Sequence, residues 1–403
     1  MTDSSKKLNH SIPPDLDAAV SSAVSRRALL AGVGGVGAAS LLGSTGVNLA
    51  LSEAASAAGG SVRWANWGYY LDFDNKTQTY PTLVDFQKKT GIKVTYQEAI
   101  DDNDTFTAKV APQLRLKKDI GYDIVTMTEW EAARWIQAGY TQKFDDAAIP
   151  NKKNVLDILA NRPLDPGRHQ SLPWAGIIAG LAWNKKKLPG GLKTLDQLFD
   201  KKYKGKRQVL VLSEMRDTIG LIMMWQGVDI AANFTENQFM NAVHKLEQLI
   251  ADGYIGQVKG QSYAQDLQAG NVMGVIGWSG DIAQLNLQVG SDQFGFAVPD
   301  SGGTFSTDNL MIASTSKNKA AAQALINYYY DPAVAARVAA YITYICPVKG
   351  AQAAMEKFAP KQAANPLIFP TADMWKKLHV FRGLTPVEQL KFSTAFQKAT
   401  GNG

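Results

Sequence analysis

Short apolar segments that are typical of β-strands alternate along this chain with segments that are typical of α-helices. In the first half, strand patterns occur at 62–65, 91–99 and 122–128, and helical patterns at 83–90, 101–114 and 129–139. In the second half, strand patterns occur at 179–184, 207–212 and 272–278, and helical patterns at 194–205, 217–227, 236–253, 317–330 and 332–342. Strands that alternate with helices pair in parallel and build α/β domains. We therefore expect an α/β fold with parallel strand pairing.

The first 58 residues have the composition of an export signal. Arg26 and Arg27 are adjacent, no charged residue occurs from Ala28 to Ala50, and small residues continue to Ala58. A charged segment, an apolar segment and a small-residue exit are the parts of a cleavable signal. The paired arginines followed by two leucines resemble a twin-arginine signal. The leader therefore predicts export, with cleavage near Ala58.

Other interpretations of this leader are weaker. The uncharged stretch 28–50 is long enough to cross a bilayer of about 30 Å as an uncleaved anchor, but its many glycines make it weakly hydrophobic. Gly32, Gly34 and Gly37 match G-x-G-x-x-G, yet that dinucleotide pattern requires a preceding strand and a βαβ unit. The leader contains no cysteine, which argues against a lipoprotein.

Composition excludes several classes of function for the remaining 345 of the 403 residues. This length is comfortable for two lobes. The leader carries as many acidic as basic residues, so the net charge of +6 stays with the rest of the chain, where it is spread without runs of Lys or Arg. Nucleic-acid binding therefore has little support.

Cofactor and metal sites also lack a sequence signal. The only cysteine, Cys346, excludes an intramolecular disulfide, and the histidines at 10, 169, 244 and 379 show no zinc-binding spacing. No G-x-S-x-G nucleophile motif occurs either. Tyr328–Tyr330 could form a tyrosinate iron site, but at the end of an amphipathic helix we expect a combination of core packing and surface exposure. We predict neither cofactor nor metal.

Aromatic residues gather at the ends of predicted strands. The first strand runs into Asn66-Trp67-Gly68-Tyr69-Tyr70, and the strand at 272–278 ends on Trp278. Open α/β sheets bind ligands at the carboxyl ends of their strands. A single tryptophan at such a place is more often part of the core, but several together favour the wall of a binding site.

The order of several motifs resembles the spermidine/putrescine-binding receptors of bacterial ABC importers, which belong to the extracellular solute-binding proteins. The motifs are NWGYY, YDIVTMTEW, SEMRD, GWSGD, TDNL and LINYYYDP, and they span nearly the whole chain after the leader. The resemblance implies a two-lobed α/β fold of the periplasmic-binding-protein type, with a hinge and an interlobe cleft. Lobe one would comprise 60–178 and 304–352, and lobe two 179–303 and 353–403.

The same resemblance implies a function without turnover. A monomeric receptor outside the cytoplasmic membrane, in the periplasm or at the cell surface, would capture a polyamine or related organic cation and deliver it to an ABC permease. The implied ligand-binding residues are Trp67, Tyr69, Thr128, Trp130, Glu214, Asp217, Trp278, Asp308 and Tyr344. Ammonium groups need carboxylate partners when they leave water, and flat aromatic faces suit both their charge and the methylenes between them.

Two positions depart from the family pattern. Tyr69 stands where the family usually has Glu, and Ser306 stands where it has Trp. One carboxylate and one aromatic wall are thus missing, so we expect a preference for a diamine or a monovalent amine over spermidine.

Alternatives remain open at this point. Glu214 and Asp217 could cap a helix, and Asp308 could be a loop residue. The same fold could bind a sugar, a ferric ion or an anion. An exported enzyme is the weakest alternative, because Glu214 and Asp217 are too close in sequence to flank a scissile bond as separate acid and base.

Overall fold

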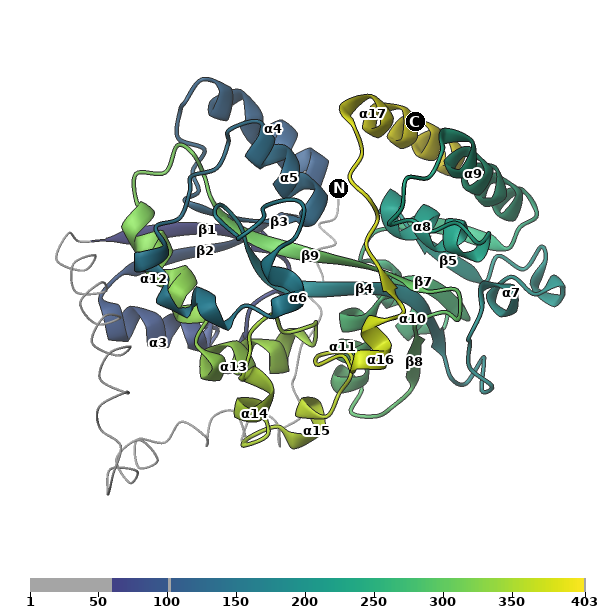
Figure 1. Ribbon diagram of the computed structural model, residues 1–403. Helices are drawn as coiled ribbons and strands as arrows, with labels where there is room; N and C mark the ends of the chain where they lie inside the picture. Colours follow the sequence, from purple (N-terminus) through teal and green to yellow (C-terminus); the bar gives the residue numbers. More distant parts are fainter. Residues whose placement is uncertain (1–59, 101–102, 402–403) are drawn as a thin grey trace, which may run out of the picture.

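The computed structural model describes residues 60–100 and 103–401, arranged as two halves (Figure 1). The predicted export signal, with Arg26, Arg27 and the cleavage point near Ala58, lies outside the described residues. Strands from both halves join in one sheet, in the order β2-β1-β3-β9-β4-β7-β5-β6. The strands of this path are β1 (Ser61–Trp67), β2 (Lys93–Ile100), β3 (Ile124–Thr128), β4 (Leu172–Asn184), β5 (Val209–Leu212), β6 (Ile255–Lys259), β7 (Gly274–Trp278) and β9 (Gly303–Ile312). Two more strands lie off the path, β8 (Phe294–Ala297) beside β4 and β10 (Leu378–His379) beside β9.

The direction of the strands differs between the periphery and the centre of the sheet. β1 pairs in parallel with β2 and β3, and β5 pairs in parallel with β6 and β7. β9 is antiparallel to β3, and β4 is antiparallel to both β9 and β7. The expectation of parallel pairing was therefore wrong at the centre. β4 and β9 carry the chain between the two halves in opposite directions (Figure 1), so they must lie antiparallel.

Helices cover the sheet in the first half. They are α3 (Pro81–Thr90), α4 (Asn103–Arg115), α5 (Glu129–Gln137), α6 (Asp157–Ala160), α12 (Lys319–Tyr329), α13 (Pro332–Ile342), α14 (Ala351–Met355), α15 (Pro360–Ala363) and α16 (Ala372–Trp375), with the 3₁₀ turns η1 (Asp146–Ala148) and η2 (Pro150–Asn154). Asp331 separates α12 from α13, because its side chain accepts the amides of Ala333 and Val334 and so caps a helix that begins on Pro332. Tyr329 and Tyr330 are buried in the core and Tyr328 is half-buried, which agrees with the predicted combination of core packing and surface exposure for this tyrosine run.

The helices of the second half are α7 (Leu195–Leu198), α8 (Met215–Trp225), α9 (Glu236–Ala251), α10 (Tyr263–Ala269), α11 (Ser279–Gln288) and α17 (Pro386–Thr400), with the 3₁₀ turn η3 (Lys201–Tyr203). Among them, α8 and α9 lie where the sequence predicted them, one predicted helix is broken, and α10, α11 and α17 were not predicted. The helix expected at 194–205 is two short pieces. Asp200 interrupts it, because its side chain accepts the amide of Lys202 and starts a new turn.

Separate hydrophobic cores stabilise the two halves. The first is built around Trp64, Phe86 and Trp174, and the second around Phe239 and Phe392. A smaller cluster of apolar side chains packs between β3 and the helices α4 and α5. The change from the first core to the second falls along β4, between Ile178 and Ala179.

The predicted division into lobes stays a prediction. The two hydrophobic cores indicate where its last boundary, predicted at residue 353, lies. Met355 and Ile368 pack in the first core, whereas Phe381 packs in the second. Because Leu378 and Val380 also pack against the first core, this packing favours a boundary between Val380 and Phe381 rather than at 353.

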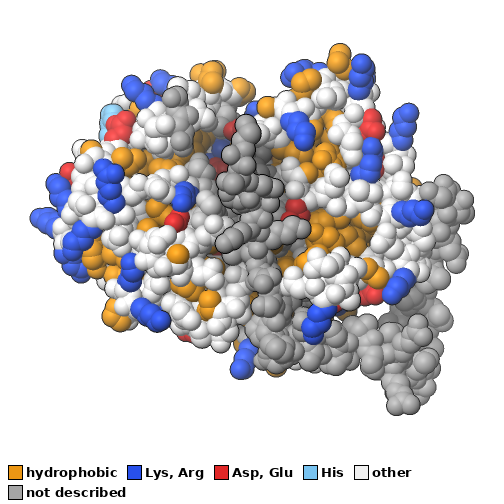
Figure 2. All heavy atoms as spheres, turned by 180° about the vertical axis from the view of Figure 1, so that it is seen from behind, with side chains coloured by type: hydrophobic (Ala, Val, Ile, Leu, Met, Phe, Trp, Pro, Cys, Tyr) orange, Lys and Arg blue, Asp and Glu red, His pale blue; other side chains and the backbone are white. Residues whose placement is uncertain are grey.

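Charged side chains are scattered over the surface. Figure 2 shows Lys and Arg spread over both halves of one face. Within residues 60–100 and 103–401, no helix is long and apolar enough to cross a membrane, and no group of three or more His, Cys, Asp or Glu is placed to hold a metal ion.

Candidate ligand-binding cleft

A cleft of about 630 Å³ lies between the two halves, a volume suited to a small molecule. One side is formed by the ends of β1 and β3, by α5 and by β9. The other side is formed by the first turn of α8, the end of β7 and the segment that leads into α17. The predicted site residues that line it are Trp67, Thr128, Trp130, Glu214, Asp217, Trp278, Asp308 and Tyr344, and Ser306 lines it too.

Asp308 lies within β9 and not in a loop, so the loop interpretation of this residue was wrong. The antiparallel register places it opposite Thr128, whose hydroxyl donates to the carboxylate at 2.8 Å. Asn103 donates in turn to the Thr128 hydroxyl at 3.0 Å, which fixes its direction. Burial raises the pKa of Asp308 to about 6, against the lowering effect of hydrogen bonds from the hydroxyls of Thr128 and Tyr70.

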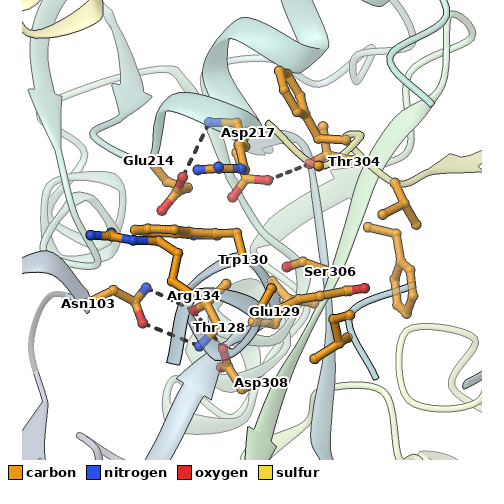
Figure 3. A pocket seen from close by; sticks show the side chains of 18 of the residues that line it. Asn103, Thr128, Glu129, Trp130, Arg134, Glu214, Asp217, Thr304, Ser306 and Asp308 are labelled. Carbon is orange, nitrogen blue, oxygen red and sulfur yellow. Dashed lines mark hydrogen bonds between the residues drawn. The ribbon is translucent and has the colours of Figure 1, made fainter. Parts of the chain in front are cut away.

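Asp217 connects three elements of the cleft. It lies in the first turn of α8, and its two oxygens accept from the Trp278 indole at 2.7 Å and the Thr304 hydroxyl at 2.6 Å. Its carboxylate therefore faces β7 and β9 and does not cap the helix. Burial raises its pKa above the ordinary value. Figure 3 shows Asp217 and Thr304 on one side of the Trp130 ring, with Thr128 and Asp308 on the other.

Glu214 combines both roles that its sequence position suggested. It is the N-cap of α8 and accepts the Arg216 amide at 3.3 Å, so the capping interpretation holds for this residue. It also lines the cleft. Burial raises its pKa to about 7, with the Arg216 charge opposing and the Asp217 charge adding to the shift.

Three tryptophans make the aromatic walls. Trp67 ends β1 and is held by a hydrogen bond from its indole to the Thr126 carbonyl at 3.0 Å. Trp278 ends β7, so both strand-end positions place their rings at the cleft as expected. Trp130, in the first turn of α5, carries the Arg216 guanidinium over its ring at 4.5 Å from the centroid.

The profile of the bacterial extracellular solute-binding proteins matches residues 82–370, which is more than half of the chain. The chain belongs to this family. Curated relatives include the spermidine/putrescine-binding periplasmic protein of Escherichia coli, 29% identical over 331 residues that cover 81% of this chain and 90% of the relative. A putrescine-binding periplasmic protein of Pseudomonas aeruginosa is 25% identical and covers 83% of this chain and 90% of its own.

Solved structures support the two-lobed α/β fold. A spermidine/putrescine ABC transporter substrate-binding protein of Streptococcus pneumoniae superposes with a TM-score of 0.70 at 22% identity, over 85% of this chain and 99% of its own. A lipoprotein of Treponema pallidum gives a TM-score of 0.70 at 17% identity, over 84% and 99%. At these identities the similarity establishes the fold, and the fold class predicted from the sequence is confirmed.

Tyr69 is the predicted site residue that this solute-binding protein does not place among those lining the cleft. Its backbone has a left-handed conformation, with φ of 60°, and its amide donates to the Glu98 carboxylate at 3.0 Å. Burial, and then the charge of Glu98, raise the pKa of its phenol. The turn therefore brings the Tyr69 amide to Glu98 on β2, and contact between the Tyr69 side chain and the ligand stays a prediction.

The solute-binding protein also lines its cleft with charged residues that the sequence interpretation missed. They are Glu129, Arg134, Arg162, Arg216 and Arg382. Arg216 could have been noticed from the sequence. A basic side chain in the first turn of α8 is unfavourable beside the positive end of the helix dipole, which indicates a role other than helix stability. The other four lie on elements whose approach to the cleft depends on tertiary packing.

Proposed function

We propose that this solute-binding protein captures a polyamine, putrescine-like or spermidine-like, or a related organic cation outside the cytoplasmic membrane and delivers it to an ABC permease. The supporting observation is a set of carboxylates without an ionic partner in a cleft walled by tryptophans. Among the described residues, no Lys, Arg or His nitrogen lies within 4.0 Å of the carboxylates of Glu214, Asp217 or Asp308.

An organic cation supplies what this cleft lacks. Buried carboxylates without a partner are unfavourable, and an ammonium group pairs with them while its methylenes contact the indole rings. The names of the relatives from Escherichia coli and Pseudomonas aeruginosa, which specify spermidine and putrescine, agree with this chemistry. An anion would meet these carboxylates as like charges, and a sugar would leave their charges unpaired.

The closing test is calorimetric titration of the exported protein with putrescine, cadaverine and spermidine, and with glucose, phosphate and ferric citrate for the alternative ligands. Asp308→Asn should weaken binding of every amine by about 30-fold or more, because removing one partner of a buried charge pair costs roughly 2–5 kcal/mol. Asp72→Asn is the matched control, since Asp72 is buried and accepts from Thr82 without lining the cleft. Tight binding of a sugar, anion or ferric ion with no binding of amines would contradict the proposal.

We further propose that the receptor acts as a monomer, requires neither cofactor nor nucleic acid, and performs no turnover. The family of extracellular solute-binding proteins supports a transport role. Its two lobes would be 60–178 with 304–352 and 179–303 with 353–403, and the packing of the two cores would move the last boundary to between Val380 and Phe381. Recovery of an unchanged amine after prolonged incubation, with one ligand bound per chain, is the expected result.

For export, the proposed route is the twin-arginine pathway, on the basis of Arg26 and Arg27. The periplasmic relatives support a location outside the cytoplasm. Replacing both arginines with lysine should stop export of the folded protein, and the mature chain should begin near residues 58–60. Undiminished export of the double variant in cells lacking this pathway would contradict the route.

A further inference from the structure

Four arginines line the cleft, and three of them are neutralised by carboxylates of the protein itself. Arg134 pairs with Glu131 at 2.7 Å, Arg162 with Glu129 at 2.8 Å and Arg382 with Glu388 at 2.6 Å. Arg216 is different: in the part of the chain that the structure describes, no carboxylate oxygen lies within the 4.0 Å of an ion pair.

Arg216 is nevertheless held in place. Its guanidinium lies 4.5 Å from the centroid of Trp130 and 6.0 Å from that of Phe381. It donates to the side-chain oxygen of Gln389 on α17. These contacts join α5 of the first half to α8 and α17 of the second half. The guanidinium therefore occupies the kind of aromatic face on which a ligand ammonium would bind.

Three carboxyl groups and one guanidinium of the cleft have no ionic partner among the described residues. When a ligand ammonium holds the three carboxyls in their ionised forms, Glu214, Asp217 and Asp308 contribute three negative charges, and Arg216 contributes one positive charge. The difference, three minus one, is two negative charges. Charges removed from water are unfavourable unless they are compensated, so the ligand that fits this cleft carries two positive charges.

We propose that Arg216 is a built-in cation that makes the cleft selective for a dicationic diamine over a tricationic triamine. This inference rests on the proposed function. The Arg216 guanidinium lies over the Trp130 ring, and Arg216 follows Glu214 and precedes Asp217 in the chain. Glu214 and Asp217 lie on one side of that ring, and Asp308 lies on the other (Figure 3). Two ammonium groups have Asp217 and Asp308 as partners. A third would have to compete with Arg216 for Glu214 and for the indole face.

The experiment measures dissociation constants of putrescine and spermidine for the wild-type protein, Arg216→Gln and Arg216→Lys. Wild type should bind putrescine at least about tenfold more tightly than spermidine, since one uncompensated buried charge costs 1.5 kcal/mol or more. Arg216→Gln keeps a planar amide that can donate to Gln389, and it should reduce or reverse this ratio by at least about tenfold. Arg216→Lys keeps the charge and should keep the ratio.

A double variant separates charge from lost contacts. Glu214→Gln combined with Arg216→Gln returns the uncompensated charge to two carboxylates, so the preference for putrescine should reappear. Glu214→Gln alone leaves one net negative charge and should shift the preference from putrescine toward the monoamine butylamine. This second single variant also tests the inference if Arg216→Gln does not fold.

Different results would overturn the proposed function and the role of Arg216. Absence of amine binding by the wild type would overturn the proposed function. Amine binding with the same putrescine-to-spermidine ratio in wild type and Arg216→Gln would overturn only the role of Arg216. Tighter binding of 5-aminovalerate than of either amine, lost in Arg216→Gln, would show that Arg216 pairs with a ligand carboxylate and would also overturn the inference.

Discussion

At the scale of single residues, the cleft carboxylates are held between two opposing effects. Burial disfavours their charged forms, while neighbouring hydroxyl and indole donors favour them. For Asp308 and Glu214 burial is the larger effect, and their pKa values rise to about 6 and about 7. An ammonium ligand binds the charged forms, so ligand binding must displace protons from these groups when the pH is near or below those values.

The first prediction is a pH dependence with opposite signs for affinity and stability. Without ligand, Asp308 and Glu214 bind more protons in the folded than in the unfolded state between about pH 4 and pH 7, so their contribution to the free energy of unfolding falls as pH rises. Affinity for putrescine changes in the other direction and should be at least about tenfold weaker at pH 5 than at pH 8. Calorimetry in buffers of different ionisation enthalpy should detect proton release on binding.

The matched variant for this prediction is Asp308→Asn, which should give a shallower pH profile because one of the two titrating groups is gone. A diamine affinity that is flat from pH 5 to pH 8 in the wild type would show that the cleft carboxylates do not pair with the ligand.

Residue by residue, the sequence predicted the site where a strand end or a helix start fixed the position. Trp67 and Trp278 end β1 and β7, and Asp217 lies in the first turn of α8, as their surroundings indicated. Tyr69 could not be placed, because its direction depends on a left-handed backbone and on Glu98, which is distant in sequence. The guanidinium of Arg216 likewise takes its position from Trp130 and Gln389 on other elements.

At the scale of elements, a glycine in the first turn of α11 lets the ring of Tyr344 pack closely against this helix. Tyr344 lines the cleft, and its hydroxyl donates to the buried Asp281 at 2.8 Å. The ring lies directly against the first turn of α11, where a Cβ atom added to Gly280 would come within 2.4 Å of the Tyr344 ring. Any side chain at position 280 therefore displaces the tyrosine from Asp281.

The second prediction is that Gly280→Ala lowers both stability and amine affinity. Overpacking of a buried site costs about 1–3 kcal/mol, and the shifted Tyr344 ring would narrow the cleft. Chemical denaturation and calorimetry measure the two effects. Gly190→Ala is the control, since no atom lies within 4 Å of its added Cβ and it should leave both quantities nearly unchanged. Equal behaviour of the two variants would mean that Tyr344 is free to move.

Element prediction succeeded where hydrophobic periodicity was strong and failed where polar residues interrupted it. α9 and α13 appear where the helical pattern predicted them. β9 was not predicted as a strand, because Thr304, Ser306 and Asp308 break its apolar pattern, and these are residues that line the cleft. The polar residues that line the cleft therefore removed the alternating apolar pattern by which β9 could have been predicted as a strand.

At the scale of the whole molecule, the two halves share β4 and β9 but keep separate cores. Such an arrangement permits a hinge, because bending two strands disturbs neither core. The ligand cleft lies between the halves, and Trp130 and Arg216 already make contact across it. A ligand that pairs with Asp308 on one side and Asp217 on the other adds a second connection and should favour the closed arrangement.

The last prediction is that a bound diamine shortens the distance between the lobes and narrows the distribution of that distance. Leu116, directly after α4, and Val387, on α17, are 66% and 76% exposed. The helices α4 and α17 belong to different halves of the molecule (Figure 1). Spin labels on Leu116→Cys and Val387→Cys report this distance, and the native Cys346 is 3% exposed and should stay unlabelled. Saturating putrescine should convert a broad distribution into a narrower one at shorter distance, since the ligand binds the closed state more tightly. The same pair of labels in an Asp308→Asn background should respond only at much higher putrescine concentration. If the wild-type distribution is the same with and without saturating diamine, the lobes do not close on the ligand, and the hinge is not part of capture.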